Sequence, residues 1–171
     1  LFEGFTLLPC YRWHRHVVVP RNHPLANVKR PTLKQLVAYP IVTYVFSVSG
    51  PSSLNELFAK EGLAPNVVLT AQDSDVIKTY VRLGLGIGIV ASMAVEAHDD
   101  ADLVNIDASD LFPAHTTWIG FRRGGLLRNY QIDFIQLFAP HLTRRLIERA
   151  VNASSKAVVD QLGTTRDSLA S

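Results

Sequence analysis

Hydrophobic and polar positions alternate along the chain with two periods, one typical of helices and one typical of strands. The clearest case is the segment Asp73–Val95, which reads DSDVIKTYVRLGLGIGIVASMAV. Over residues 74–83 apolar side chains recur every three or four positions, as on the buried face of an amphipathic helix. An acidic or hydroxyl residue can cap its start, and Gly84 suits the left-handed position after its end. Residues 87–91 are apolar or glycine throughout, which predicts a strand buried on both faces.

The same patterns predict further elements along the chain. Strands are expected at residues 16–19, 41–46, 66–70, 103–106 and 116–121, and helices at residues 33–39, 54–60, 127–138 and 144–151. Because strands alternate with helices on short loops, the chain is expected to be an α/β protein with a mostly parallel sheet. Residues 152–171 are richer in Ser, Ala and Thr and are expected to form a loosely packed tail.

The segment SVSGPSS, residues 47–53, is the best candidate for a binding site. It joins the end of a predicted strand to the start of a predicted helix, where α/β sheets bind ligands and free N–H groups attract anions. Ser47, Ser49 and Ser52 could add hydroxyl donors, and Gly50 would let a ligand approach the backbone closely. The loop holds no lysine or arginine, so neutral dipoles would bind an anion there. The alternative is that one of its serines only caps the following helix.

Other patterns in the chain do not indicate catalysis, a cofactor or a metal. The run Gly84–Gly88 follows a helix and opens a strand, which is the reverse of the order in a dinucleotide-binding loop. His14 and His16 lack the convergent partners of a metal site. The segment 47–50 has no glycine two residues before either serine, as a nucleophile elbow requires. A binding domain is therefore favoured over an enzyme.

Composition narrows the class of protein further. The chain has 171 residues, 47% of them hydrophobic and 19% charged, which is typical of soluble globular domains. A net charge of +2 is too small to indicate nucleic-acid binding. The single cysteine, Cys10, excludes an internal disulfide and fits a reducing compartment as a small buried hydrophobe. No apolar run approaches the roughly 20 residues that span a bilayer. Because the chain begins with Leu1 and its only methionine is Met93, we expect a fragment.

Three long segments resemble a known family. They are PIVTYVFSVSG, TAQDSDVIKTYVRLGLGIGIVASMAV and TTWIGFRRGGLLRNYQIDFIQLFAPHLTR. They resemble the effector-binding domain of LysR-type transcriptional regulators, and within that family the CysB-like branch, which LPCYRW near the start also supports. The resemblance covers about residues 1–151.

The resemblance implies a fold with two α/β lobes like those of periplasmic binding proteins, with the effector in the cleft between them. The second lobe is expected to be complete and the first partial. Residues 1–19 would belong to the first lobe and residues 20–110 to the second. Residues 111–151 would return to the first lobe and add the C-terminal helices, and residues 152–171 would be a weakly structured tail.

The resemblance also implies a function. CysB-like proteins are cytoplasmic regulators of sulfur assimilation and cysteine biosynthesis that sense acetylserine, with sulfate or thiosulfate as opposing anions. The full regulators act as tetramers and bind DNA through a winged helix-turn-helix, which is absent from this chain. No membrane contact is implied.

The resemblance also assigns candidate effector ligands. A threonine hydroxyl of the family, in the loop between strand and helix, aligns with Ser49. We add Ser47, Gly50, Thr43 and Trp13 as candidates, although Thr43 could simply face inward and Trp13 could be a core residue. Further contacts are expected from first-lobe segments that precede Leu1.

The sequence is also compatible with two other classes of protein. A fragment of an extracytoplasmic solute-binding protein would follow the same physical rules. An enzyme is a weaker alternative, because no acid–base pair, metal set or activated nucleophile is apparent.

Overall fold

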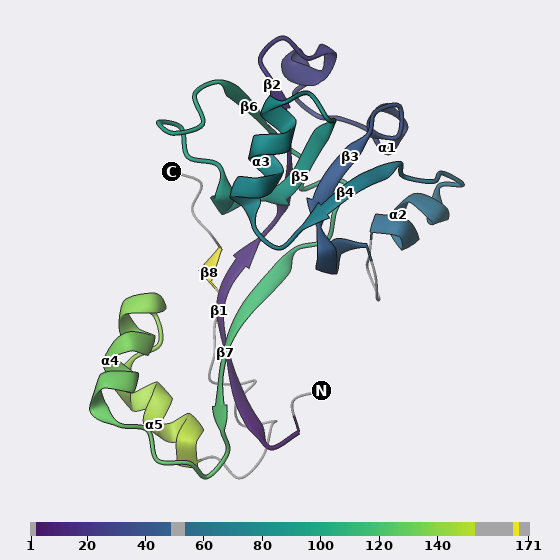
Figure 1. Ribbon diagram of the computed structural model, residues 1–171. Helices are drawn as coiled ribbons and strands as arrows, with labels where there is room; N and C mark the ends of the chain where they lie inside the picture. Colours follow the sequence, from purple (N-terminus) through teal and green to yellow (C-terminus); the bar gives the residue numbers. More distant parts are fainter. Residues whose placement is uncertain (1–2, 49–53, 153–165, 168–171) are drawn as a thin grey trace. The chain divides into compact units, whose positions relative to one another are not determined.

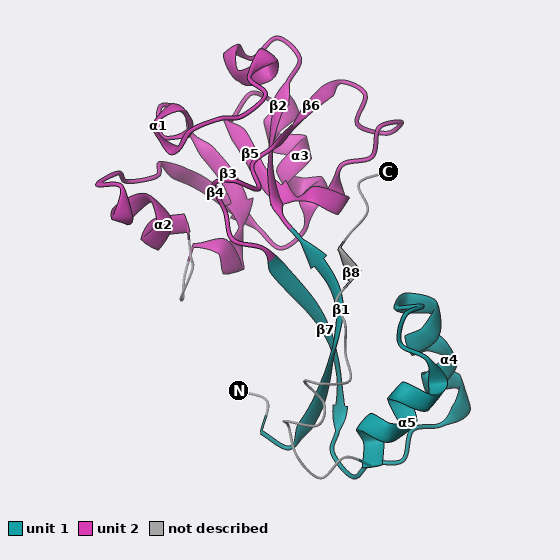
Figure 2. Ribbon diagram, turned by 180° about the vertical axis from the view of Figure 1, so that it is seen from behind, with its two compact units in different colours: residues 1–13, 115–169, 171 teal, residues 14–114, 170 magenta. Residues whose placement is uncertain are grey.

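The computed structural model describes residues 3–48, 54–152 and 166–167 (Figure 1). The chain divides into two compact units (Figure 2): unit 1 holds residues 1–13, 115–169 and 171, and unit 2 holds residues 14–114 and 170. Each unit combines a sheet with helices, which confirms the predicted α/β class. The lobe boundaries near residues 20 and 110 stay a prediction. No helix among the described residues is long and apolar enough to cross a membrane.

Unit 2 is built on a five-stranded sheet in the order β4-β3-β5-β2-β6. Its strands are β2 (Arg15–Pro20), β3 (Ile41–Tyr44), β4 (Val67–Ala71), β5 (Ile87–Ala91) and β6 (Leu103–Asp107). Strand β3 runs parallel to β4 and β5, whereas β2 runs antiparallel to β5 and β6. The sheet is therefore mixed, and the expectation of a mostly parallel sheet is wrong. One consequence is that β2 starts where β3 and β5 end.

Helices cover both faces of this sheet. They are α1 (Leu33–Leu36), α2 (Leu54–Lys60) and α3 (Ser74–Arg82), with short 3-10 turns η1 (Pro24–Asn27), η2 (Val45–Ser47) and η3 (Ser92–Ala94). One hydrophobic cluster contains Val17 and Ile89 of the sheet with Phe58 of α2. The other contains Val18 and Val90 with Ile77 of α3. Because successive strand residues point to opposite faces, alternate residues of β2 and β5 supply the two clusters.

Helix α3 and strand β5 form as the sequence pattern predicts. The Asp73 carboxylate accepts a hydrogen bond from the Val76 N–H at 2.9 Å, and Gly84 has a φ of +78° after the helix end. A Cβ added at Gly88 would lie 2.9 Å from Cγ2 of Val81, so glycine lets α3 pack directly on β5. The glycine run therefore serves turning and close packing.

Two elements of unit 2 are shorter than predicted. Strand β3 ends at Tyr44, two residues early, because the chain turns into η2. Helix α1 has four residues and is held by a capping box between Thr32 and Gln35.

Unit 1 contains the strand pair β1 (Phe5–Trp13) and β7 (His115–Arg122), which run antiparallel, with β8 (Arg166–Asp167) parallel to β1. Helices α4 (Asn129–Phe138) and α5 (Arg144–Asn152) pack beside them (Figure 1). The core of unit 1 includes Cys10, which has no exposed surface, as expected of a small buried hydrophobe. Strand β1 was not among the predicted elements.

Candidate functional site

The candidate site lies at the carboxyl end of the unit 2 sheet, where the parallel strands β3, β4 and β5 finish. In open α/β sheets this end is where ligands bind. Turn η2 continues β3 there and ends at Ser47, whose side chain is fully buried. Ser49 and Gly50 lie outside the described residues. Of the predicted loop, Ser47 and Val48 belong to the described residues.

Arg15, the first residue of β2, contacts Ser47. Its Nη2 atom donates a hydrogen bond to the Ser47 hydroxyl oxygen at 3.3 Å. The Arg15 residue is 2% exposed, and its guanidinium carbon lies 5.8 Å from the centre of the Phe112 ring. Nε and Nη1 of the guanidinium are buried and have no hydrogen-bond partner in the part of the chain that the structure describes. Among the described residues, no carboxylate forms a salt bridge with Arg15.

The charge of Arg15 persists despite this burial. Burial lowers the pKa of the guanidinium. An arginine side chain nevertheless stays protonated in proteins, because its ordinary pKa lies far above neutral pH. The carboxyl end of the sheet therefore holds a buried positive charge next to a serine hydroxyl. The expectation that only neutral dipoles are available near this loop is incomplete.

Contacts between neighbouring strands fix the position of the Arg15 backbone. Arg15 lies opposite Ala91, the last residue of β5. The Ala91 N–H donates to the Tyr44 hydroxyl at 3.2 Å, and the Ser92 N–H donates to the His14 carbonyl at 2.9 Å. These two bonds connect the start of β2 and the ends of β3 and β5. The backbone of Arg15 is thus placed where the start of β2 meets the ends of β3 and β5.

Thr43 lies in the interior of the same sheet. It is fully buried in β3, and its hydroxyl donates to the carbonyl of Ile89 at 2.9 Å. The hydroxyl hydrogen of Thr43 is therefore engaged in a hydrogen bond that connects β3 to β5. The role of Thr43 as an effector ligand stays a prediction.

Trp13 belongs to unit 1, whereas Ser47 and Thr43 belong to unit 2. Its indole N–H donates to the Thr117 hydroxyl at 3.2 Å, and its ring stacks on His115 with a centroid distance of 4.6 Å. These contacts connect β1 to β7. A role for Trp13 in effector binding also stays a prediction.

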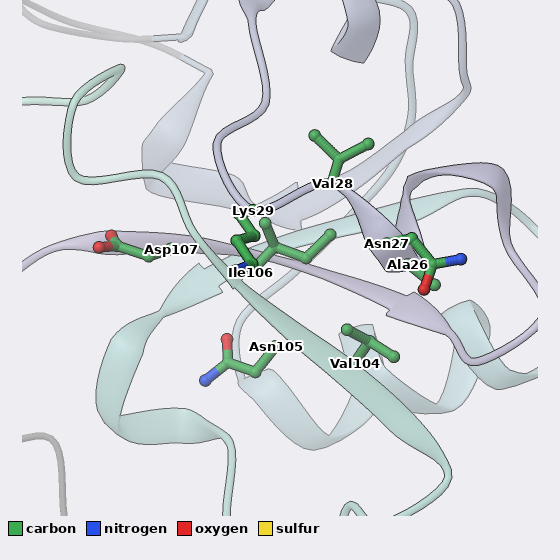
Figure 3. A pocket seen from close by; sticks show the side chains of 8 residues that line it. All are labelled: Ala26, Asn27, Val28, Lys29, Val104, Asn105, Ile106 and Asp107. Atoms are coloured by element: carbon green, nitrogen blue, oxygen red, sulfur yellow. The ribbon is translucent and has the colours of Figure 1, made fainter.

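A separate pocket of about 420 Å³ lies along strand β6 (Figure 3). Its lining is mixed, with apolar Val104 and Ile106 beside polar Asn105, Lys29 and Asp107. Strand β6 is at the edge of the sheet, and β2 and β5 separate it from β3. This pocket therefore includes neither Ser47 nor Arg15. The described residues contain no group of three metal-binding side chains.

Sequence patterns did not indicate Arg15 as a site residue. Ser47 follows it by 32 positions, and their contact depends on the strand order, with β5 between β2 and β3. The signal that was present is a charged residue two positions before the apolar run 17–19, which is buried in the core. A cation at the end of a buried strand needs a partner, and this requirement could have singled out Arg15.

The chain is similar in sequence to known transcriptional regulators. The chain is 53% identical over 150 residues to the HTH-type transcriptional regulator CysB of Haemophilus influenzae, covering 88% of this chain and 46% of the relative. It is 50% identical over 141 residues to the HTH-type transcriptional regulator SsuR of Burkholderia cenocepacia, covering 82% and 46%. The chain thus spans about half the length of the curated relatives it matches.

A solved structure agrees with the sequence matches. The crystal structure of the cofactor-binding domain of the Cbl transcriptional regulator has a TM-score of 0.78 and 41% identity, covering 89% of this chain and 67% of that one. These findings confirm the resemblance and the fold of LysR effector-binding domains. Residues 1–143 match the LysR substrate binding domain, so the chain belongs to this family.

Proposed function

We propose that this chain is the effector-sensing part of a cytoplasmic LysR-type regulator of sulfur assimilation and cysteine biosynthesis. The observation that carries the proposal is the 53% identity to CysB over 150 residues. The similarity to SsuR and Cbl supports the same group. The effector is acetylserine, or an anion such as sulfate or thiosulfate.

The buried Ser47 and Arg15 support an effector with a negative charge at the carboxyl end of the unit 2 sheet. Ser49 and Gly50, which follow in the same loop, provide further contacts in this proposal. Thr43 and Trp13 complete the proposed set of effector-binding residues.

In this proposal the effector regulates DNA binding because it binds one conformation of the protein better than another. An effector shifts the balance between two conformations only to the extent that it binds one of them better. The longer regulator binds DNA through a winged helix-turn-helix and assembles as a homotetramer. The effector-dependent change reaches DNA through that assembly.

This proposal excludes a catalytic role. The relatives CysB, SsuR and Cbl are transcriptional regulators. For the same reason the alternative of an extracytoplasmic solute-binding protein is not favoured.

Calorimetry on the full-length protein tests the proposal. Acetylserine, sulfate and thiosulfate are titrated into the wild type, the Ser49→Ala variant and a control, Thr79→Ala, which removes an exposed hydroxyl from α3. The wild type and the control are expected to bind at least one of the three. The Ser49→Ala variant loses a hydrogen bond to a charged ligand, worth about 1.5–3 kcal/mol.

Two results would contradict parts of the proposal. Failure of all three compounds to bind the wild type would remove the sulfur-effector assignment. Equal affinity in the wild type and the Ser49→Ala variant would remove Ser49 from the site and leave the effector assignment intact.

A further inference from the structure

Unit 2 holds a buried positive charge, that of Arg15, without a counter-charge among the described residues. Charged side chains are almost never fully buried unless they are paired, because removing an ion from water costs several kcal/mol. Arg15 is 2% exposed, and its single described hydrogen bond goes to a neutral hydroxyl. No negative group among the described residues therefore balances this charge.

We infer that Arg15 supplies the positive charge that binds the anionic group of the effector, with Ser47 beside it, an inference that rests on the proposed function. The anionic group has charged oxygens, as a sulfate-like oxoanion or a carboxylate does. Arg15 is thus a specificity-determining residue, because it favours charged effectors over neutral ones of the same shape.

The guanidinium has the unused donors that such a group needs. It carries five N–H bonds in a planar fork that matches the oxygens of carboxylates and oxoanions. Nη2 uses one of them on Ser47, at 3.3 Å, which is long for a hydrogen bond. Nε and Nη1 are buried without a hydrogen-bond partner. Charge-assisted hydrogen bonds to an anion would satisfy these donors.

The Phe112 ring does not replace an anion. At 5.8 Å its centre is near the outer limit of about 6 Å for a cation–π contact. A ring face also leaves Nε and Nη1 without an acceptor, because they have no hydrogen-bond partner.

Another buried cation of the same unit has the counter-charges that Arg15 lacks. Lys78 is 7% exposed, and its Nζ lies 2.9 Å from a carboxylate oxygen of Asp100 and 3.2 Å from one of Asp75. Unit 2 thus pairs this buried cation with carboxylates when its role is structural. The contrast indicates that the partner of Arg15 comes from outside the described chain.

The position of Arg15 fits a ligand contact. It lies opposite Ala91 at the carboxyl end of the sheet, and it reaches the last residue of η2. The residues that follow η2 are the predicted effector loop. The charge is therefore held on a strand of the sheet beside Ser47, and a strand is a rigid support for a binding group.

Calorimetry and thermal unfolding of the full-length protein test this inference. The variants are Arg15→Gln, which removes the charge but keeps an N–H donor for Ser47, and Arg15→Lys, which keeps the charge. Arg30→Met is the matched control, because Arg30 is exposed in the same unit and pairs only with the exposed Asp110 among the described residues. Sodium sulfate and acetylserine are the two probes.

The Arg15→Gln variant is expected to bind sulfate at least about tenfold more weakly, and the rise of Tm with sulfate is expected to disappear. Arg15→Lys should retain more affinity than Arg15→Gln, and Arg30→Met should match the wild type. Without ligand, Arg15→Gln should unfold at the same or a higher temperature, because an uncompensated buried charge has been removed. Loss of sulfate binding alone identifies an oxoanion as the partner, and loss of acetylserine binding identifies the carboxylate.

The inference is overturned if Arg15→Gln binds both probes with wild-type affinity and unfolds at a lower temperature, which is the result for a purely structural arginine. The proposed function would survive that result. If the wild type binds neither probe, both statements fail. If Arg15→Gln does not fold, Arg15→Lys decides, because a structural role predicts unchanged affinity for sulfate in a folded lysine variant, whereas loss of the planar fork predicts weaker binding.

Discussion

Thr43 shows how a single hydroxyl holds two parallel strands together. It lies opposite Ile89 in the sheet, has no exposed surface, and donates its hydrogen to the Ile89 carbonyl at 2.9 Å. A buried polar group of this kind contributes stability only as long as its partner is present. The hydroxyl therefore has a structural role whether or not it also meets an effector.

We predict that Thr43→Val lowers the free energy of unfolding by about 1 kcal/mol, because one buried hydrogen bond is lost while the shape of the side chain is kept. Urea unfolding followed by circular dichroism measures the change. Thr79→Val is the control, since Thr79 is exposed on α3 and its substitution should change the free energy by less than about 0.5 kcal/mol. A Thr43→Val protein as stable as the wild type would show that the bond to Ile89 contributes nothing.

The contact between Arg15 and Ser47 shows which site residues could be predicted from the sequence and which could not. Ser47 could be predicted as a candidate because its loop joins a strand end to a helix start, which is a local pattern. Arg15 could not be paired with it, because the two residues are 32 positions apart and meet only through the order of three strands. Local patterns carry no information about that order.

At the scale of elements, a charged cluster connects α3 to the segment that precedes β6. Asp100 is 4% exposed and accepts hydrogen bonds from Lys78 Nζ at 2.9 Å, from Arg82 Nη2 at 2.8 Å and from the Glu96 N–H at 3.0 Å. Both cations belong to α3. The carboxylate of Asp100 therefore holds the 96–102 loop against that helix.

The protonation of Asp100 follows from these contacts. Burial raises the pKa of this carboxyl, but hydrogen bonds from Lys78, the Glu96 backbone and Arg82 lower it by more, so the pKa lies below its ordinary value. A carboxyl with a depressed pKa in the folded state stabilises the fold above its unfolded pKa, about 3.9. That contribution is lost as the pH falls through the folded pKa.

We predict that Asp100→Asn lowers the free energy of unfolding at neutral pH by about 3–5 kcal/mol, because the ammonium of Lys78 stays buried after losing its main partner. The difference between the variant and the wild type should shrink as the pH falls from about 4 through the depressed pKa of folded Asp100, where the wild-type carboxylate also becomes protonated. Urea unfolding at a series of pH values measures both effects.

Asp75→Asn is the control. Asp75 also pairs with Lys78, but its side chain is 88% exposed, so its substitution is expected to lower the free energy of unfolding by about 0–1 kcal/mol. Equal stability of Asp100→Asn and the wild type at neutral pH would contradict the role of Asp100.

The elements themselves were predictable where the periodic pattern was undisturbed. Helix α2 and strand β5 have the predicted bounds, because their apolar positions and flanking glycines agree. Strand β1 was not predicted, since Pro9 interrupts its pattern and proline usually excludes a central strand. The structure accommodates Pro9 through a register shift between Pro9 and Tyr11, which is a β-bulge.

At the scale of the whole molecule, the family and the α/β class could be predicted, but the mixed sheet could not. Strand β2 pairs antiparallel with both β5 and β6, which follow it by about 70 and 90 positions. A pattern of alternating strands and helices favours parallel pairing and gives no sign of a strand that runs the other way. Because a mostly parallel sheet was expected, the antiparallel β2, and with it the charge of Arg15 at the carboxyl end, was not foreseen.

Unit 1 exposes an apolar surface. Tyr130, Phe134 and Leu137 recur at spacings of four and three residues on α4, so they share one face of the helix. Phe134 is 60% exposed and Leu137 is 83% exposed. An apolar groove of about 410 Å³ lies beside this face, between α4 and β7. Monomeric proteins rarely expose contiguous apolar patches larger than a few hundred Å², and larger patches mark association surfaces.

We predict that the 171-residue chain by itself self-associates through this face, because burying large apolar side chains contributes about 25 cal/mol for each Å² removed from water. Size-exclusion chromatography with light scattering should give a mass that rises with protein concentration above the 18.9 kDa of one chain. The double variant Phe134→Gln, Leu137→Gln should shift that mass toward the monomer.

Leu83→Gln is the matched control, because Leu83 is 74% exposed but belongs to unit 2 and lies outside this face. Its substitution should leave the mass unchanged. A monodisperse wild-type monomer at all concentrations, or equal effects of the double variant and the control, would show that α4 does not drive association.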